Sequence, residues 1–94
     1  DEYEYRMGTL LFEMDQFQEA VEAFRNVFAN PASPYRDKPE LKAQMAAALC
    51  NVGVELYEAE DLEGALHHYM EALGYDQENG DIFFNLAKVY MLQK

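Results

Sequence analysis

One arrangement of small and large residues occurs twice in this chain, at positions 45 residues apart. The stretch "LCNVGVELYEAEDLEGALHHYMEAL", which begins at Leu49, has a counterpart that begins at Glu4. The matching pairs are Gly8 and Gly53, Leu11 and Leu56, Phe17 and Leu62, Ala20 and Ala65, Phe24 and Tyr69, and Phe28 and Leu73. Self-similarity of this kind predicts one supersecondary unit that is built more than once and stacked on itself.

The spacing within the first copy is helical. Apolar residues recur every three or four positions through residues 3–14 and again through residues 17–28, which predicts two helices within residues 3–29. Asp15 is the expected N-cap of the second helix, and Gln18 is expected to complete a capping box with it. A connection this short makes the two helices antiparallel neighbours.

Residues 30–39, "NPASPYRDKP", hold all three prolines of the chain and predict its one clear loop. We expect this loop to be a mobile and replaceable insertion that carries Tyr35 and Arg36 as extra contact residues. Pro39 suits the first turn of a helix, because an N–H at that position has no intrahelical partner.

The second copy predicts a long helix from about Glu40, followed by a helix that Asp61 caps and Gly74 ends. A fifth helix is predicted over residues 81–93, and no strict alternation of apolar and polar residues predicts a strand. We expect the fifth helix to leave an apolar face without a partner helix. The residues of that face are Phe83, Leu86, Val89 and Tyr90.

Small residues recur where helices must approach one another closely. Gly8, Gly53 and Ala87 stand at the same place in the first helix of each copy. Ala20 and Ala65 are expected to allow the same close approach from the second helices, and large apolar residues at positions 24 and 69 are expected to fill the gap between repeats.

Residues 49–76 and residues 83–90, "FFNLAKVY", resemble the tetratricopeptide repeat family, in which small, large and aromatic residues follow this order over 34 positions. The words "NVG" and "NLA", at Asn51 and Asn85, are 34 residues apart. The resemblance implies an all-α, right-handed solenoid of helix hairpins with about two and a half units, or five helices. The sequence departs from the family at the 45-residue first interval and at Gln77, where a proline is frequent.

A single domain over residues 1–94 is predicted from this resemblance. Its parts are a first repeat at residues 3–29, an inserted loop at 30–39, a second repeat with a lengthened first helix at 40–76, and the first helix of a third repeat at 81–93.

The charge of the chain limits its partners. Eighteen acidic and 7 basic residues give a formal net charge of -11. No basic stripe is present to displace counterions from phosphates, so neither nucleic acid nor an anionic membrane surface is an expected partner. The charge favours either solubility alone or the attraction of basic partners.

Cysteine and hydropathy bear on location. Cys50 is the only cysteine, which excludes an internal disulfide and fits a reducing compartment, so we expect a cytoplasmic location. No apolar run reaches the ~18 residues that a membrane span needs. No signal peptide is visible, but the chain begins at Asp1 without a methionine, so this observation carries little weight.

Catalysis finds little support in the sequence, and neither enzymatic activity nor a metal or other cofactor is expected. Glu63, His67 and Glu71 recur at a spacing of four, but a solvated helix face is a simpler interpretation than a metal site. Cys50 has no basic neighbour in the sequence that would lower the pKa of its thiol.

The family resemblance implies a concave groove lined by the first helix of each unit. The expected groove residues are Tyr5, Arg6, Thr9, Phe12, Asn51, Val54, Tyr57, Phe84, Asn85 and Lys88. The aromatic members suit the role of anchors, and the asparagines can donate and accept hydrogen bonds to a peptide backbone. Each residue can instead pack on its neighbours or face water.

These expectations favour a protein–protein interaction module that binds a peptide or a helix of a partner in the groove. The alternative is a structural segment of a longer solenoid with no ligand of its own. Self-association through the C-terminal helix is a further expected contact. Some relatives have a clamp for a terminal carboxylate. Such a clamp is not expected here, because Asn51 is the only one of the clamp residues that this sequence has.

Overall fold

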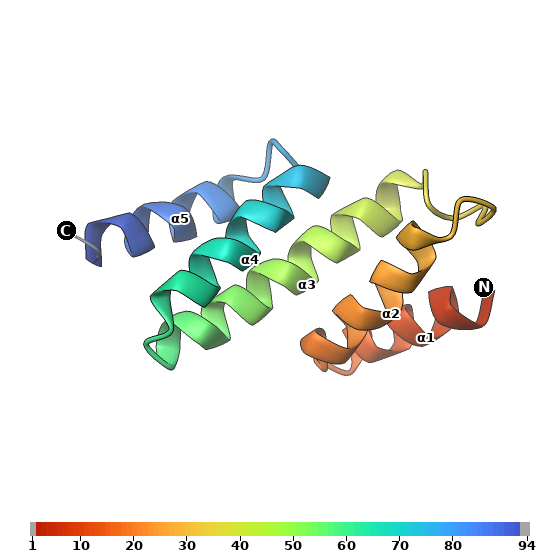
Figure 1. The fold of residues 1–94 in the computed structure, drawn as a ribbon, viewed down its shortest axis with the longest axis horizontal. Helices are drawn as coiled ribbons and strands as arrows, with labels where there is room; N and C mark the ends of the chain where they lie inside the picture. Colours follow the sequence, from red (N-terminus) through yellow and green to blue (C-terminus); the bar gives the residue numbers. More distant parts are fainter. Residues whose placement is uncertain (1, 93–94) are drawn as a thin grey trace.

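The computed structural model describes residues 2–92 and contains five α-helices and no strand within them. The helices are α1 (Glu2–Glu13), α2 (Phe17–Ala29), α3 (Pro39–Glu58), α4 (Leu62–Tyr75) and α5 (Gly80–Leu92). Helices α1 and α2 form one antiparallel hairpin, α3 and α4 form a second, and α5 lies beside α4 (Figure 1). The prediction of an all-α chain of helix hairpins is confirmed. The predicted end of the last helix, residue 93, lies outside the described residues.

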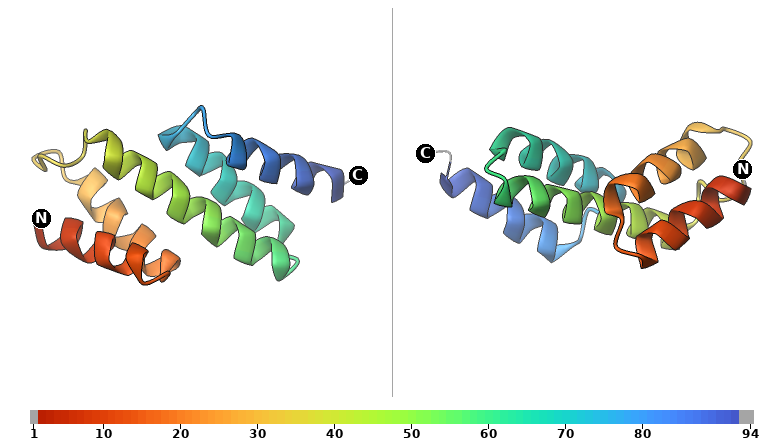
Figure 2. Two further views of the ribbon diagram at one scale, coloured as in Figure 1. Left: turned by 180° about the vertical axis from the view of Figure 1, so that it is seen from behind. Right: turned by 90° about the horizontal axis from the view of Figure 1, so that it is seen from below.

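The helices form two layers. Figure 2 (right) shows α2 and α4 along one side of the molecule and α1, α3 and α5 along the other. Helix α3 lies in the centre and contacts all four other helices, whereas α1 packs chiefly against α2. The molecule is elongated, with extents of 43 × 23 × 18 Å.

Each hairpin closes around a glycine. A Cβ atom added to Gly8 would lie 2.6 Å from the ring of Phe24, and one added to Gly53 would lie 2.5 Å from the ring of Tyr69. Both rings are almost fully buried. The prediction that helices approach closely at Gly8 and Gly53 is confirmed, since neither glycine leaves room for a methyl group. The rings of Phe24 and Tyr69, which were expected in the gap between repeats, lie against the glycine of their own hairpin.

The end of α1 differs from the prediction. Asp15 has a positive φ of 62° and is the left-handed residue that ends α1. Its N–H donates to the carbonyl of Phe12 (3.1 Å), and the N–H of Gln16 donates to that of Leu11 (2.9 Å). These two bonds form a Schellman motif. The N-cap of α2 is Gln16, which makes no side-chain cap bond, so the predicted capping box of Asp15 with Gln18 is wrong.

The end of α3 has the same geometry 45 residues later. Glu60 has a φ of 67°, and its N–H donates to the carbonyl of Tyr57 (3.0 Å). The N–H of Asp61 donates to the carbonyl of Leu56 (2.8 Å). The carboxylate of Asp61 also accepts a hydrogen bond from the N–H of Gly64 (3.0 Å), which confirms Asp61 as the cap of α4.

The proline-rich loop is packed on the first hairpin. The Ser33 side chain is buried, and its hydroxyl accepts a hydrogen bond from the N–H of Tyr35 (3.3 Å). The ring of Tyr35 stacks on that of Tyr5, with centroids 4.2 Å apart and planes 1° apart. The prediction of a freely replaceable insertion did not anticipate this contact between the loop and α1. As expected, Pro39 opens α3 in its first turn.

The prediction that Gly74 ends α4 is wrong. Gly74 lies inside α4, which continues to Tyr75 and ends on an extended residue, Asp76. No glycine among the described residues has a positive φ, so Gly74 does not serve as a terminating residue.

Helix α5 buries part of the face that was expected to stay open. Val89 is fully buried and Leu86 is 6% exposed, because both pack into the shared core. Phe83 and Tyr90 are each 52% exposed, as predicted. The open face of α5 is therefore narrower than expected, and we define it by Phe83 and Tyr90.

Candidate functional site

Side chains of α3 and α5 meet on the side that the sequence predicted as a groove. The Lys88 ammonium lies 4.9 Å from the ring centroid of Tyr57 and 5.5 Å from that of Phe84. Both distances are within the range of a cation–π interaction. Phe84 is 66% exposed, so this aromatic surface is open to solvent. We call Tyr57, Phe84, Asn85 and Lys88 the α3–α5 cluster.

A polar contact joins the same two helices. The Asn85 amide donates a hydrogen bond to the Cys50 sulfur, at 3.3 Å. Burial raises the pKa of the Cys50 thiol above its usual value, the Asn85 hydrogen bond opposes this shift, and the nearby Asp81 carboxylate adds to it. A thiol with a raised pKa is a poor nucleophile, so this cysteine is suited to packing rather than to covalent chemistry.

The predicted groove residues of α1 are arranged differently from those of α5. Tyr5 is half-buried under Tyr35, and the Thr9 hydroxyl donates to the carbonyl of Tyr5 within α1 (3.0 Å). Phe12 packs edge-on against Phe17 of α2, with centroids 5.6 Å apart. Arg6 is exposed. Only part of this row is therefore available to a partner.

The two remaining predicted residues lie on α3. Asn51 is exposed, and its amide donates to the carbonyl of Ala47 one turn earlier (2.9 Å). Val54 is half-buried and packs against the core. The Asn51 side-chain oxygen is left as an acceptor at the surface.

The structure brings the predicted residues together in two places. One is the α3–α5 cluster, and the other is Tyr5 with Tyr35, at the opposite end of the chain. The sequence predicted Tyr35 as an extra contact residue in the loop, and its stacking on Tyr5 was not anticipated. Its position as the single aromatic residue between the three prolines was the available signal that the loop has an anchor.

Within residues 2–92, no group of three or more His, Cys, Asp and Glu side chains is arranged to hold a metal ion. Glu71, one of three acidic or histidine side chains spaced by four on α4, instead forms an ion pair with Arg25 of α2 at 2.7 Å. None of the described helices is long and apolar enough to cross a membrane.

Comparison with known families gives one match. Residues 53–94 match a family model described as TPR repeat, which covers the end of α3, all of α4 and the segment that contains α5. No curated protein and no solved structure matches the chain. The matched segment begins at Gly53, the residue around which the second hairpin closes.

Proposed function

We propose, starting from residues 53–94 as a member of the tetratricopeptide repeat family, that this protein binds a peptide or a helix of a partner protein in the groove beside α3 and α5. Repeats of this family are modules for protein–protein interaction or scaffolding. The same family context favours a binding role without catalysis. A cytoplasmic location stays a prediction from the cysteine content.

The α3–α5 cluster is the observation that carries this proposal. The Lys88 ammonium lies within cation–π distance of two aromatic rings, and both contacts favour this position of its charge. Phe84 offers a large exposed ring beside that charge. A partner residue that places an apolar group on Phe84 and a carbonyl or carboxylate oxygen on Lys88 fits this arrangement.

Asparagine side chains extend this surface along both helices. Asn51 on α3 keeps a free amide oxygen, and Asn85 on α5 uses its amide on Cys50 and keeps its oxygen. Both oxygens are acceptors for the N–H groups of an extended peptide. The groove therefore combines one anchor ring, one cation and two side-chain acceptors for a peptide backbone.

Two adjacent phenylalanines provide a matched test. Phe84 lies in the α3–α5 cluster, whereas Phe83 belongs to the open face of α5, and both are more than half exposed. A peptide array first selects a binding peptide for the wild-type protein. We expect Phe84→Ala to weaken the selected peptide by roughly tenfold or more, and Phe83→Ala to change its affinity by less than about twofold.

The alternative function, a structural segment of a longer solenoid, makes a different prediction for the same assay. It expects no peptide to bind, or binding that both phenylalanine variants reduce equally. Either result contradicts the groove proposal. Unchanged melting temperatures of both variants serve as the control for folding.

A second candidate function, self-association, is supported by the open face of α5. Phe83 and Tyr90 lie there, and Met70 of the neighbouring α4 is exposed to a similar degree. Exposed apolar side chains of this size are typical of association surfaces. Burying them between two copies of the chain would remove apolar surface from water and leave the α3–α5 cluster accessible.

Sedimentation across a concentration series tests this candidate. We expect the wild-type protein to form dimers as its concentration rises, and Tyr90→Lys or Phe83→Ala to shift the equilibrium toward the monomer. Phe84→Ala is the matched control and should leave the dimer unaffected. A wild-type protein that stays monomeric at the highest concentration contradicts self-association.

A further inference from the structure

A cleft lies between the second helices of the two hairpins, away from the proposed groove. The backbones of α2 and α4 lie apart, and both helices rest on α3, which forms the floor. Their side chains meet at Arg25 with Glu71, and at Phe28 with Tyr75, whose ring centroids lie 5.0 Å apart. Val52 and Leu56 of α3 line the floor, and Val21 of α2 lines one wall. Val52 and Val54 are two residues apart on α3 and therefore point about 200° apart, so the floor of the cleft faces away from the proposed groove.

The cleft has a volume of about 260 Å³. Sites for small organic ligands commonly enclose ~300–1,000 Å³. The cleft is smaller than this range, so its size fits one long side chain of a partner protein better than it fits a cofactor. Its apolar floor favours a side chain with a methylene stem.

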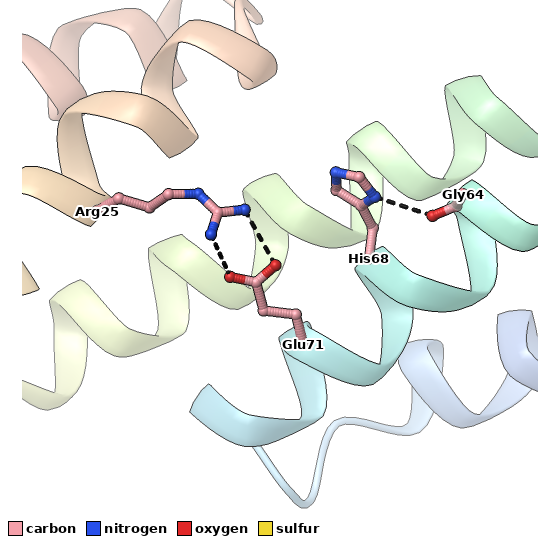
Figure 3. A network of polar contacts seen from close by, with 4 residues as sticks. All are labelled: Arg25, Gly64, His68 and Glu71. Carbon is pink, nitrogen blue, oxygen red and sulfur yellow. Dashed lines mark hydrogen bonds and ion pairs between the residues drawn. The ribbon is translucent and has the colours of Figure 1, made fainter.

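The single cation at the rim of the cleft already has a partner. Both terminal nitrogens of Arg25 bind the carboxylate of Glu71, at 2.7 and 3.0 Å, and this pair bridges α2 and α4 across the cleft (Figure 3). A bidentate pair of this kind is strong and directional. Arg25 therefore closes one end of the cleft and contributes little net charge to it.

The other polar groups at the rim include several hydrogen-bond acceptors. His68 Nδ1 lies 2.8 Å from the carbonyl of Gly64 (Figure 3). A carbonyl only accepts, so Nδ1 carries the proton in this contact, and in that tautomer Nε2 is an acceptor. Glu22 is exposed on the α2 wall and has no ion pair or hydrogen bond among the described residues. Gln18, one turn earlier on α2, adds an amide oxygen.

We propose that this cleft binds an arginine side chain of a basic partner protein, with its methylene stem on the floor of Val52 and Leu56 and its guanidinium on the Glu22 carboxylate. Acceptors at the rim match the donors of a guanidinium, which has five N–H groups and no acceptor. The net charge of -11 draws a basic partner toward the molecule. The cleft would give the protein a second contact surface in addition to the proposed groove.

NMR titration with a capped arginine tests this proposal. The probe is N-acetyl-arginine N-methylamide, and the matched probe is the citrulline equivalent, which has the same shape without the charge. We expect saturable shifts of the backbone amides of Val21, Val52 and Leu56, and roughly tenfold weaker binding of the citrulline probe. The amides of Phe84 and Lys88 should not shift, which separates this site from the proposed groove.

A pair of exposed glutamates on α2 supplies matched variants. Glu22→Gln should weaken the arginine probe by roughly tenfold, whereas Glu19→Gln removes the same charge from the same helix outside the cleft and should leave binding unchanged. Equal binding of both probes, equal effects of both variants, or shifts confined to α5 would each overturn the proposal. None of these outcomes depends on whether a peptide binds in the groove.

Discussion

The hairpin α1–α2 and the hairpin α3–α4 use the same contacts at positions 45 residues apart, but they differ in how much of each is covered. Gly8 faces Phe24 as Gly53 faces Tyr69, and the first helix of each hairpin ends in a Schellman motif. Helix α3 has seven buried residues, because it lies in the centre of the molecule and contacts all four other helices. In α1 only Gly8 is buried among the residues whose burial the structure describes.

At some equivalent positions the two hairpins have different residues, and these residues match the difference in burial. Leu49 of α3 is fully buried, whereas its counterpart in α1 is Glu4, whose carboxylate accepts a hydrogen bond from Asn26 of α2 (2.7 Å). An exposed polar pair is tolerated at the edge of the stack and would be costly at its centre. The comparison teaches that the repeat sets the contacts inside each hairpin, and that position in the stack sets the polarity around them.

Leucine at the two glycines gives the largest expected effect. Gly53→Leu should destabilise the protein by about 2–4 kcal/mol, because Tyr69 leaves no room and α3 is held on both sides. Gly8→Leu should cost about 1–3 kcal/mol, since α1 packs chiefly on α2 and can shift outward. Urea denaturation followed by circular dichroism measures both values.

Gly74→Ala is the control for these variants. An added Cβ at Gly74 meets no atom within 4 Å, so the substitution should stabilise α4 by about 0.5–1 kcal/mol through helix propensity alone. If Gly8→Leu destabilises the protein as much as Gly53→Leu, the number of neighbouring helices does not explain the difference between the two hairpins.

The buried rings of the two hairpins should respond differently to alkaline pH. Burial raises the pKa of Tyr69 from 10.0 to about 12, whereas Phe24 at the matching position does not ionise. The folded state holds the phenolic proton more tightly, so this contribution to stability is complete below pH 10 and is lost as the pH rises toward 12. The loss is about 1 kcal/mol near pH 11.

The Tyr69→Phe variant checks this linkage. We expect its melting temperature to fall less than that of the wild-type protein between pH 8 and pH 11. Tyr75, whose pKa burial also raises, remains in both proteins and cancels from the difference. Parallel loss of stability in the two proteins contradicts a role for Tyr69.

Exchanging the helix caps should make the hairpins more alike. Asp61→Gln removes the bond to the N–H of Gly64 and should destabilise α4 by about 1 kcal/mol. Gln16→Asp should install the equivalent bond at the N–H of Glu19 and stabilise α2 by about 0.5–1 kcal/mol. Urea denaturation of both variants decides whether the side-chain cap, which α4 has and α2 lacks, contributes to a difference in stability between the hairpins.

The smallest expected effect is at the two left-handed residues. Glycine tolerates a positive φ without the clash of a Cβ atom, so Glu60→Gly should stabilise the protein by up to about 1 kcal/mol. Asp15→Gly should gain less, because aspartate adopts this conformation more readily than glutamate. Differential scanning calorimetry should rank the gains in that order, and a loss at both positions would contradict the assigned helix ends.

The sequence by itself determined the helices and the contacts inside each hairpin. Apolar spacing defined the helices to within a few residues, and the recurrence of Gly8 and Gly53 indicated where the helices approach closely. These features depend on residues close in the sequence, where helical geometry relates spacing to direction. The N-cap of α2 shows the limit of prediction from the sequence, because it is Gln16 and not Asp15. Both residues are polar, and only the backbone conformation shows that Asp15 ends α1.

Only the tertiary structure decided which surfaces are covered and which remain open. Arg25 and Glu71 are 46 residues apart, and Tyr5 and Tyr35 join a helix to a loop, so no local pattern predicts either contact. Likewise, Val89 is buried by the shared core, while Tyr90 beside it stays open. The physical reason is the same in each case: burial and pairing depend on which neighbour lies opposite a side chain, and the way the hairpins pack sets that neighbour.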